Sequence, residues 1–276
     1  MFMGISYESV VGQSSEQLND SVDIVFKEVE AKLPEILEDI NARFSEKLPF
    51  HSADHTEEVF RRAHIVTSKI NEAFSHNGEP LTEAEVRVVA TVALTHDYDQ
   101  VFNQNGTQRL ASDHIKMKLL EIDDDTSESR SLLSLRRLFP SLPLTDLERS
   151  AMAATIAVFD HEAGLIQPGL DEYSIEAESG EVIENKVFVT DWIIALADLG
   201  SAGLDEPEQF HRMGNRLFIE MNPDFMSTIT KLVEGGNVAD ESIDMLNSYI
   251  NWHAGQRRFI EQRRSTIIRQ LSNKKI

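Results

Sequence analysis

Histidine and aspartate side chains at the ends of apolar helical patterns are the groups of this chain that could do chemistry. One apolar stripe at helical spacing consists of Val59, Ala63, Val66 and Ile70. His55 lies four residues before this stripe and continues it, so its imidazole is expected to face the core. His51 lies another four residues earlier, and the two imidazoles become neighbours if the helix or its cap extends that far.

Two further apolar segments end in carboxylates. Asp97 continues the apolar face of the helix expected before it, and His96 is its neighbour in the chain. Asp198 closes an almost unbroken apolar run over residues 186–198. A buried carboxylate is costly unless it is paired or coordinates a metal ion. Two imidazoles and two carboxylates suit a divalent metal such as zinc, iron or manganese, and the alternative is a buried set that satisfies itself.

The elements that must position these side chains are helices. Apolar residues recur at helical spacing in 14–45, with Pro34 as a break or first-turn residue, and in 53–73, 207–220, 224–234 and 240–271. Capping boxes begin at Thr82 and Thr145, and the run 186–198 is favoured as a buried helix. The acidic stretches 121–130 and 170–184 are expected to be exposed loops.

The scarcity of turn residues agrees with this helical pattern. The 276 residues include only 13 glycines and 8 prolines, whereas folds rich in β-structure need many turns. We therefore expect an all-α chain with an N-terminal helical extension over residues 1–45. A single compact multi-helix domain is expected over residues 46–276, with the metal site in a central pocket.

Composition and charge exclude several classes of function. The chain has 26 Lys and Arg against 47 Asp and Glu, a formal net charge of −21, which disfavours nucleic acids and anionic membrane surfaces as partners. Without cysteine there are no disulfides, thiolate metal sites or cysteine nucleophiles. The start of the chain does not resemble a secretory signal, and no run approaches the roughly 18 apolar residues of a membrane span. A cytoplasmic protein is expected, and a small phosphorylated substrate remains compatible if a metal supplies positive charge.

The ordered pattern H…HD…D, with the adjacent His-Asp ending an apolar helix, resembles the HD-domain metal-dependent phosphohydrolase superfamily. Within it, FHSADHTEEVF at 50–60 is similar to the Y-H-N-x-x-H-x-x-x-V signature of class I cyclic-nucleotide phosphodiesterases. ALTHDYDQ at 93–100 is similar to their A-x-x-H-D-x-D-H, and ALADLGSAG at 195–203 to their A-D-L-S-N. Shorter likenesses occur at 155–161 and 210–220, so the resemblance covers roughly residues 45–260.

This resemblance implies an HD/PDEase-like catalytic domain that hydrolyses a phosphoric ester, most of all a phosphodiester, with cyclic nucleotides among the candidates. It implies a first divalent metal ion held by His55, His96, Asp97 and Asp198. Asp97 would bridge to a second ion, with zinc, magnesium, manganese and iron as candidate metals. The ions would activate the attacking hydroxide, and His51 would be the general acid for the leaving oxygen. Asp54 and Glu58 lie near His51 in the sequence, and either could orient it.

Several positions depart from the family pattern. Gln100 stands where the family has a second histidine after H-D-x-D. That histidine lies next to the metal ligands and influences the metal-bound water. Further candidates to support the ligands or bind substrate are Asp113, His114, Asp160 and His161. Gln256 is the nearest candidate for the glutamine that recognises the purine, but it lacks the family's local context and is interpreted as a surface helix residue.

Two other functions remain open from the sequence. HD-domain di-iron oxygenases use the same scaffold with additional histidine ligands, for which His114 and His161 are available. A non-catalytic HD module used for binding is the third interpretation. The basic stretch 257–276, with seven Lys and Arg and one Glu, could meet a membrane or a partner. We favour its packing on the acidic body of its own domain or of a second subunit, which makes a homodimer a candidate assembly.

Overall fold

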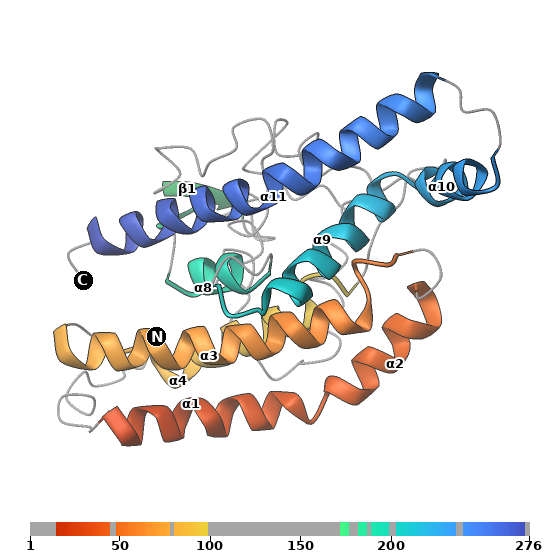
Figure 1. Cartoon of the computed structure of the whole chain (residues 1–276). Coiled ribbons are helices and arrows are strands. Elements are labelled where there is room, and N and C mark those ends of the chain that lie inside the picture. Colours follow the sequence, from red (N-terminus) through yellow and green to blue (C-terminus); the bar gives the residue numbers. More distant parts are fainter. Residues whose placement is uncertain are drawn as a thin grey trace.

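Eight helices and one two-stranded hairpin make up the part of the chain that the computed structural model describes (Figure 1). The described residues are 15–44, 48–77, 80–98, 172–176, 182–186, 189–198, 203–235 and 240–273. The helices are α1 (Ser15–Glu30), α2 (Leu33–Phe44), α3 (Ala53–Asn77), α4 (Glu83–Thr95), α8 (Val189–Asp198), α9 (Pro207–Met221), α10 (Phe225–Val233) and α11 (Asp240–Asn273). The described chain is therefore all-α, as the sequence predicts, apart from the hairpin.

The hairpin corrects one prediction. Strand β1 (Glu172–Glu176) pairs antiparallel with β2 (Val182–Lys186), with Ile175 opposite Ile183. The interpretation of residues 170–184 as a loop is wrong for these two strands.

The break between α1 and α2 lies where the sequence places it. Pro34 is the second residue of α2, a first-turn position whose missing backbone N–H has no helical partner to lose. The chain turns just before it, where the backbone N–H of Lys32 donates to the carbonyl of Val29 at 2.9 Å.

The core is built around α3, which packs against α1, α2, α4 and α8. In Figure 1, α1 runs beside α3. Fully buried side chains from five helices share this core: Val22, Phe26, Ile36, Val59, Ala63, Val89 and Ile193. The described part of the predicted N-terminal extension, α1 and α2, therefore contributes to the same core as α3.

Helix α4 is buried on nearly all sides, with every residue from 88 to 95 in the interior. Its capping box is formed as predicted: the backbone N–H of Glu85 donates to Thr82 Oγ1 at 3.3 Å, and that of Thr82 to Glu85 Oε2 at 2.7 Å. Because such a helix cannot turn a face to water, the residues at its C-terminal end are also held inside. The second capping box, at Thr145, lies outside the described residues.

Side chains of α11 form polar contacts with the backbone and with one side chain of α9. Trp252 Nε1 donates to the carbonyl of Gly214 at 3.1 Å, and the Tyr249 hydroxyl to Asn215 Oδ1 at 3.1 Å. Gln256 is only 7 % exposed, and its amide fills the space where a side chain on Gly214 would lie. The interpretation of Gln256 as a surface residue is therefore wrong.

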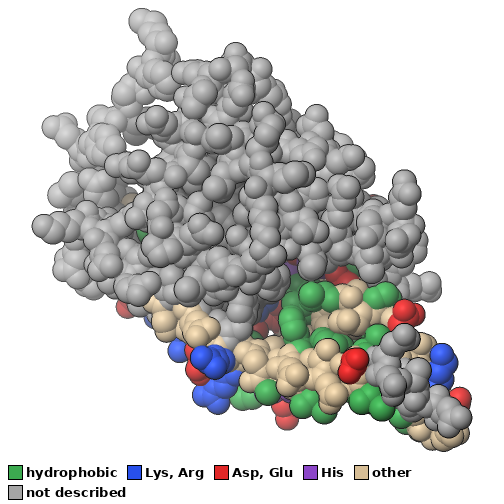
Figure 2. All heavy atoms as spheres, turned by 90° about the horizontal axis from the view of Figure 1, so that it is seen from above, with side chains coloured by type: hydrophobic (Ala, Val, Ile, Leu, Met, Phe, Trp, Pro, Cys, Tyr) green, Lys and Arg blue, Asp and Glu red, His purple; other side chains and the backbone are tan. Residues whose placement is uncertain are grey.

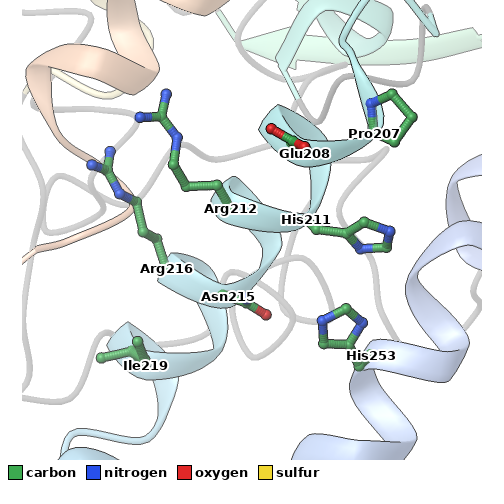
Figure 3. A pocket seen from close by; sticks show the side chains of 8 residues that line it. All are labelled: Pro207, Glu208, His211, Arg212, Asn215, Arg216, Ile219 and His253. Carbon is green, nitrogen blue, oxygen red and sulfur yellow. The ribbon is translucent and has the colours of Figure 1, made fainter.

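A pocket of about 560 Å³ lies along α9 and is also lined by His253 of α11 (Figure 3). His211 of α9 and His253 of α11 lie next to each other in its wall, with ring centroids 4.8 Å apart. Arg212 and Arg216 also line it, and Arg216 donates to Asp54 of α3 at 2.8 Å.

The surface carries exposed apolar side chains on α10 and on the first half of α11. They are Met226, Val233, Ile243 and Ile250, between 47 and 82 % exposed. In Figure 2 hydrophobic side chains gather toward the end of the molecule where these helices lie. Farther along α11, the guanidinium of Arg264 lies close to Gly203, so the basic half of this helix contacts its own chain there. No helix among the described residues carries an apolar stretch long enough to cross a membrane.

Candidate metal centre

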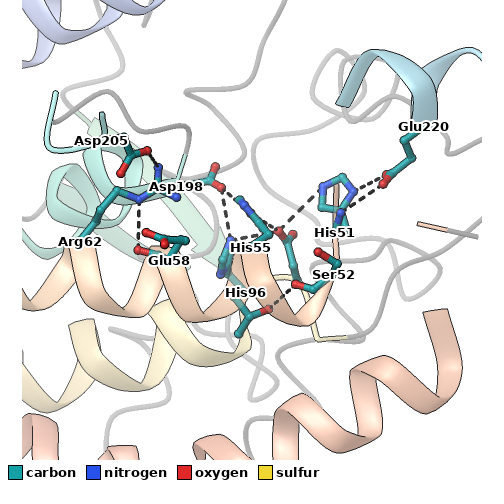
Figure 4. Close-up of polar contacts among 11 residues, drawn as sticks. His51, Ser52, His55, Glu58, Arg62, His96, Asp198, Asp205 and Glu220 are labelled. Atoms are coloured by element: carbon teal, nitrogen blue, oxygen red, sulfur yellow. Dashed lines mark hydrogen bonds and ion pairs between the residues drawn. The ribbon is translucent and has the colours of Figure 1, made fainter. Parts of the chain in front are cut away.

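Four side chains from three helices and their ends meet in the interior. His55 comes from the first turn of α3, His96 and Asp97 follow the last residue of α4, and Asp198 ends α8. One ligand atom from each of the four lies within 4.8 Å of the others, and Figure 4 shows His55, His96 and Asp198 turned toward one another. The structure thus brings together the set that the sequence predicts, and no other such group occurs among the described residues.

One nitrogen of each imidazole in this cluster, Nε2, faces both carboxylates. His55 Nε2 lies 3.1 Å from Asp97 Oδ2 and 3.1 Å from Asp198 Oδ1. His96 Nε2 lies 3.1 Å from the same oxygen of Asp97 and 3.4 Å from that of Asp198. The four atoms therefore surround one small space.

The orientation of these groups fits a cation better than a hydrogen-bonded network. Of the four contacts, only that between His55 and Asp97 has the alignment of a hydrogen bond. Within the described part of the chain, His96 Nε2 and both oxygens of Asp198 are buried without a hydrogen-bond partner. Buried polar atoms without a partner cost roughly 1–3 kcal/mol each, so the cluster is costly unless something binds at its centre. Two imidazole nitrogens and two carboxylates that converge in this way are a donor set for a divalent metal.

Without a metal ion, positive imidazoles compensate the negative charges of the two buried aspartates, and a bound cation would take over this role. Burial alone would raise the pKa of Asp97, but the charges of His96 and His51 outweigh it and hold this pKa well below its usual range. For Asp198, burial is likewise outweighed by the adjacent imidazoles of His55 and His96, which lower its pKa. In turn, the two carboxylates overcome burial and raise the pKa of His96 well above 6.5. Without metal, imidazole protons neutralise the carboxylates, and a bound cation would displace them.

His51 lies beside the cluster and is held by a residue from a distant helix, Glu220 in the last turn of α9. Glu220 Oε2 accepts hydrogen bonds from the backbone N–H groups of Phe50 at 2.9 Å and His51 at 3.1 Å. Its other oxygen pairs with His51 Nδ1. This leaves His51 Nε2 directed toward the cluster, 3.8 Å from Asp97 Oδ2.

The surrounding carboxylates keep His51 protonated. Burial lowers its pKa, but Glu220 and then Asp97 outweigh this effect and raise the pKa to about 9. The same pairing holds the pKa of Glu220 below its ordinary value, against the effect of its burial. At neutral pH the imidazole is therefore cationic and carries a proton at the edge of the cluster.

Glu220 replaces the residues that the sequence suggests for orienting His51. Asp54 accepts instead from Arg216 of α9, and the Glu58 carboxylate accepts from Arg61 at 2.7 Å. The expectation that Asp54 or Glu58 orients His51 is therefore wrong. Glu220 lies at the end of the segment 210–220, but no local sequence pattern assigns it to His51.

Five predicted site residues lie outside the described residues: Gln100, Asp113, His114, Asp160 and His161. Their predicted roles around the ligands or the substrate stay predictions.

No protein-family model, curated protein or solved structure matches this chain. What the chain itself establishes is a helical protein with a buried cluster of two histidines and two aspartates that could hold a metal ion.

Proposed function

We propose that this protein is a metal-dependent phosphohydrolase that cleaves a phosphodiester. One observation carries the proposal: a histidine, His51, directs Nε2 toward a buried cluster whose donor atoms converge as metal ligands do. Phosphoric ester hydrolysis needs an activated water, neutralisation of the phosphate charge and a proton for the leaving oxygen. The cluster and His51 offer groups suited to all three needs.

His55, His96, Asp97 and Asp198 would hold the metal. A bound divalent cation, or a pair of them, would activate water and neutralise the phosphate oxygens. The burial of His55 and Asp198, at 0 and 1 % exposed, keeps bulk water from competing for these ligands.

His51 would donate the proton to the leaving oxygen from Nε2, the nitrogen that faces the cluster. Glu220 supports this role in two ways. By pairing with Nδ1 it fixes the orientation of the ring, and by its charge it keeps the imidazole protonated at neutral pH.

The pair His51–Glu220 also favours an enzyme over a module that only binds. A buried carboxylate that accepts three hydrogen bonds from the segment 50–51 is an arrangement that metal binding alone does not require. The alternative function, a di-iron oxygenase, would need His114 and His161 as additional metal ligands. Both residues lie outside the described part of the chain, so no described contact favours this alternative.

The experiment is metal analysis of the purified protein, followed by hydrolysis of a panel of phosphodiesters and phosphomonoesters with Mg²⁺, Mn²⁺ or Zn²⁺. Asp198→Asn should lose the metal and the activity together. His51→Gln should keep the metal and lose about 10²–10⁴-fold in kcat, the usual contribution of general acid catalysis. His64→Gln is the matched control, because His64 is a histidine of α3, the helix that follows His51, and it pairs with Asp23 at the surface.

Failure of every ester in the panel with every metal would contradict the proposal. Tightly bound iron together with oxygen consumption would point to the oxygenase instead. Equal loss of activity in His64→Gln and His51→Gln would show that the effect is not specific to the site.

A further inference from the structure

A buried ion pair lies next to the metal cluster. Arg62 Nη1 donates to Asp205 Oδ2 at 2.8 Å, and the two side chains are 2 and 3 % exposed. Figure 4 shows this pair beside Asp198, with His55 and His96 on the other side of that carboxylate. The pair is therefore a neighbour of the cluster and not part of it.

The pair joins the two chain segments that carry facing members of the cluster. Arg62 lies seven residues after His55 on α3, two helical turns along the same face. Asp205 lies seven residues after Asp198, in the segment that leads from α8 to α9. The contact Arg62–Asp205 thus runs beside the contact His55–Asp198 and ties the same two parts of the chain together.

We infer that Arg62 and Asp205 are positioning residues, which hold Asp198 at the place beside His55 that a metal ion requires. The inference rests on the proposed metal binding of the cluster.

The carboxylate of Asp198 needs such support from elsewhere in the chain. Its close neighbours, His55 and His96, belong to the cluster themselves, and no described residue outside the cluster donates a hydrogen bond to either of its oxygens. Its position then depends on how α8 and the segment after it are anchored. Asp205 anchors that segment, since its carboxylate bonds to Arg61 and Arg62 of α3.

The anchor is fixed at several points. Arg62 Nε donates to the carbonyl of Glu58 at 3.1 Å, which locks the guanidinium against its own helix. The second oxygen of Asp205 accepts from Arg61 Nη2 at 3.0 Å, so both carboxylate oxygens are held by α3. Arginine offers this planar, two-sided geometry and lysine does not.

Net stability alone does not explain the pair. A buried ion pair is often no more stabilising than apolar residues of the same volume, because desolvation offsets the attraction. Its geometry, in contrast, is specific, and it lies where a shift of the chain would move a metal ligand.

The test compares wild-type protein with Arg62→Met, Arg62→Lys and Asp205→Asn. Affinity for Zn²⁺ is measured by competition with a chromophoric chelator, and ligand geometry from the visible spectrum of the Co²⁺-loaded protein. We expect Zn²⁺ affinity to fall by about tenfold or more in Arg62→Met and Asp205→Asn, as for other residues that orient metal ligands. The Co²⁺ bands should change in position or intensity, and Arg62→Lys should fall between wild type and Arg62→Met.

Arg87→Met is the matched control. Arg87 also bridges two carboxylates, those of Glu28 and Glu83, but at the surface and away from the cluster. Its Zn²⁺ affinity and Co²⁺ spectrum should equal those of wild type.

Unchanged affinity and an unchanged Co²⁺ spectrum in the folded variants would overturn the inference, even if their unfolding temperature falls, because that pattern describes a purely structural pair. If Arg62→Met fails to fold, Arg62→Lys and Asp205→Asn decide. If wild-type protein binds neither Zn²⁺ nor Co²⁺, the proposed metal-dependent function fails together with the inference. If wild-type protein binds metal and the variants bind it equally well, the positioning role alone fails.

Discussion

At the scale of single residues, His51 shows how one imidazole can be given two separate tasks. Its Nδ1 is engaged by Glu220, and its Nε2 faces Asp97 across 3.8 Å. The ring is therefore held from one side and offers its proton on the other. Because both neighbours are carboxylates, the cationic form is favoured despite burial.

Glu220→Gln should move the alkaline limb of activity to lower pH. Glu220 raises the pKa of His51 toward about 9, so its loss lowers this pKa, and the acid form disappears at lower pH. An opposite charge at this distance shifts a pKa by roughly 1–3 units, which sets the expected displacement. The measurement is the pH profile of kcat/KM for phosphodiester hydrolysis, with NMR titration of His51 as an independent readout.

Asp54→Asn is the control for this change, since Asp54 is an acidic neighbour in sequence that pairs with Arg216 and not with His51. If Glu220→Gln leaves both the alkaline limb of the pH profile and the NMR titration of His51 unchanged, Glu220 does not set the pKa of His51.

The residues of the cluster could be predicted from the sequence, whereas Glu220 could not be assigned. His55, Asp97 and Asp198 each continue an apolar pattern within their own element, so local periodicity places each of them inside. The partner of His51 lies 169 residues farther along the chain, and only packing of α9 against the start of α3 brings it close. Local patterns contain no information on such pairs.

At the scale of helices and strands, α4 delivers His96 and Asp97 from its C-terminal end, while its N-terminus is closed by the capping box. Thr82→Ala should lower the free energy of unfolding by about 1 kcal/mol, because the backbone N–H of Glu85 loses its acceptor. Urea unfolding at neutral pH measures this effect. Thr82→Ser keeps a hydroxyl and should stay close to wild type, and equal losses in the two variants would contradict a capping role.

The contact between α9 and α11 predicts strong coupling between two substitutions. A Cβ on Gly214 would lie 1.5 Å from Gln256 Nε2, so Gly214→Ala must displace a buried amide and should destabilise the protein. In a Gln256→Ala background the obstacle is gone, and alanine should then stabilise the helix by up to about 1 kcal/mol relative to glycine. The coupling, of roughly 0.5–3 kcal/mol, is measured by unfolding the four proteins of the double-mutant cycle in urea.

Gly255→Ala is the control for this cycle. Gly255 also lies in a helix, but no atom would meet its Cβ within 4 Å, so alanine should be neutral or stabilising there. Additive effects of Gly214→Ala and Gln256→Ala would contradict the packing described for α9 and α11.

The helices were predictable and the hairpin was not recognised, for a physical reason. The helical segments are long, and their apolar residues repeat at helical spacing over several turns. This periodicity identifies a helix even where the local composition alone would not. The strands are five residues each, and acidic residues around them suggested solvent-exposed loop. The period-two alternation of Tyr173 and Ile175, followed by the dipeptide Ser179–Gly180, was the available indication of a hairpin.

At the scale of the whole molecule, the cluster links stability to pH. In metal-free protein the lowered pKa of Asp97 contributes stability that is present above about pH 4 and is lost as pH falls through its folded value. The raised pKa of His51 contributes stability that is complete below pH 6.5 and is lost as pH rises through about 9. The contribution of the cluster without metal is therefore largest between these limits and declines on the alkaline side.

Metal binding should reverse this alkaline decline. A cation needs neutral imidazoles, so its affinity for the cluster rises with pH as His96, whose pKa is raised, gives up its proton. At a free metal concentration 100 times Kd, the folded state gains about 2.7 kcal/mol, and EDTA should remove that gain. Urea unfolding with Mn²⁺ and with EDTA, between about pH 6 and pH 8.5, should show two curves that diverge as pH rises.

Asp198→Asn provides the control, because it replaces one of the four carboxylate or imidazole donors by an amide of the same size. Its curves with Mn²⁺ and with EDTA should coincide at every pH. If metal stabilises the protein equally at both ends of the pH range, the ion does not bind at the cluster. The same conclusion follows if the stabilisation persists in Asp198→Asn. A stabilisation that grows with pH and depends on Asp198 would instead tie metal, protons and folding to the same four side chains.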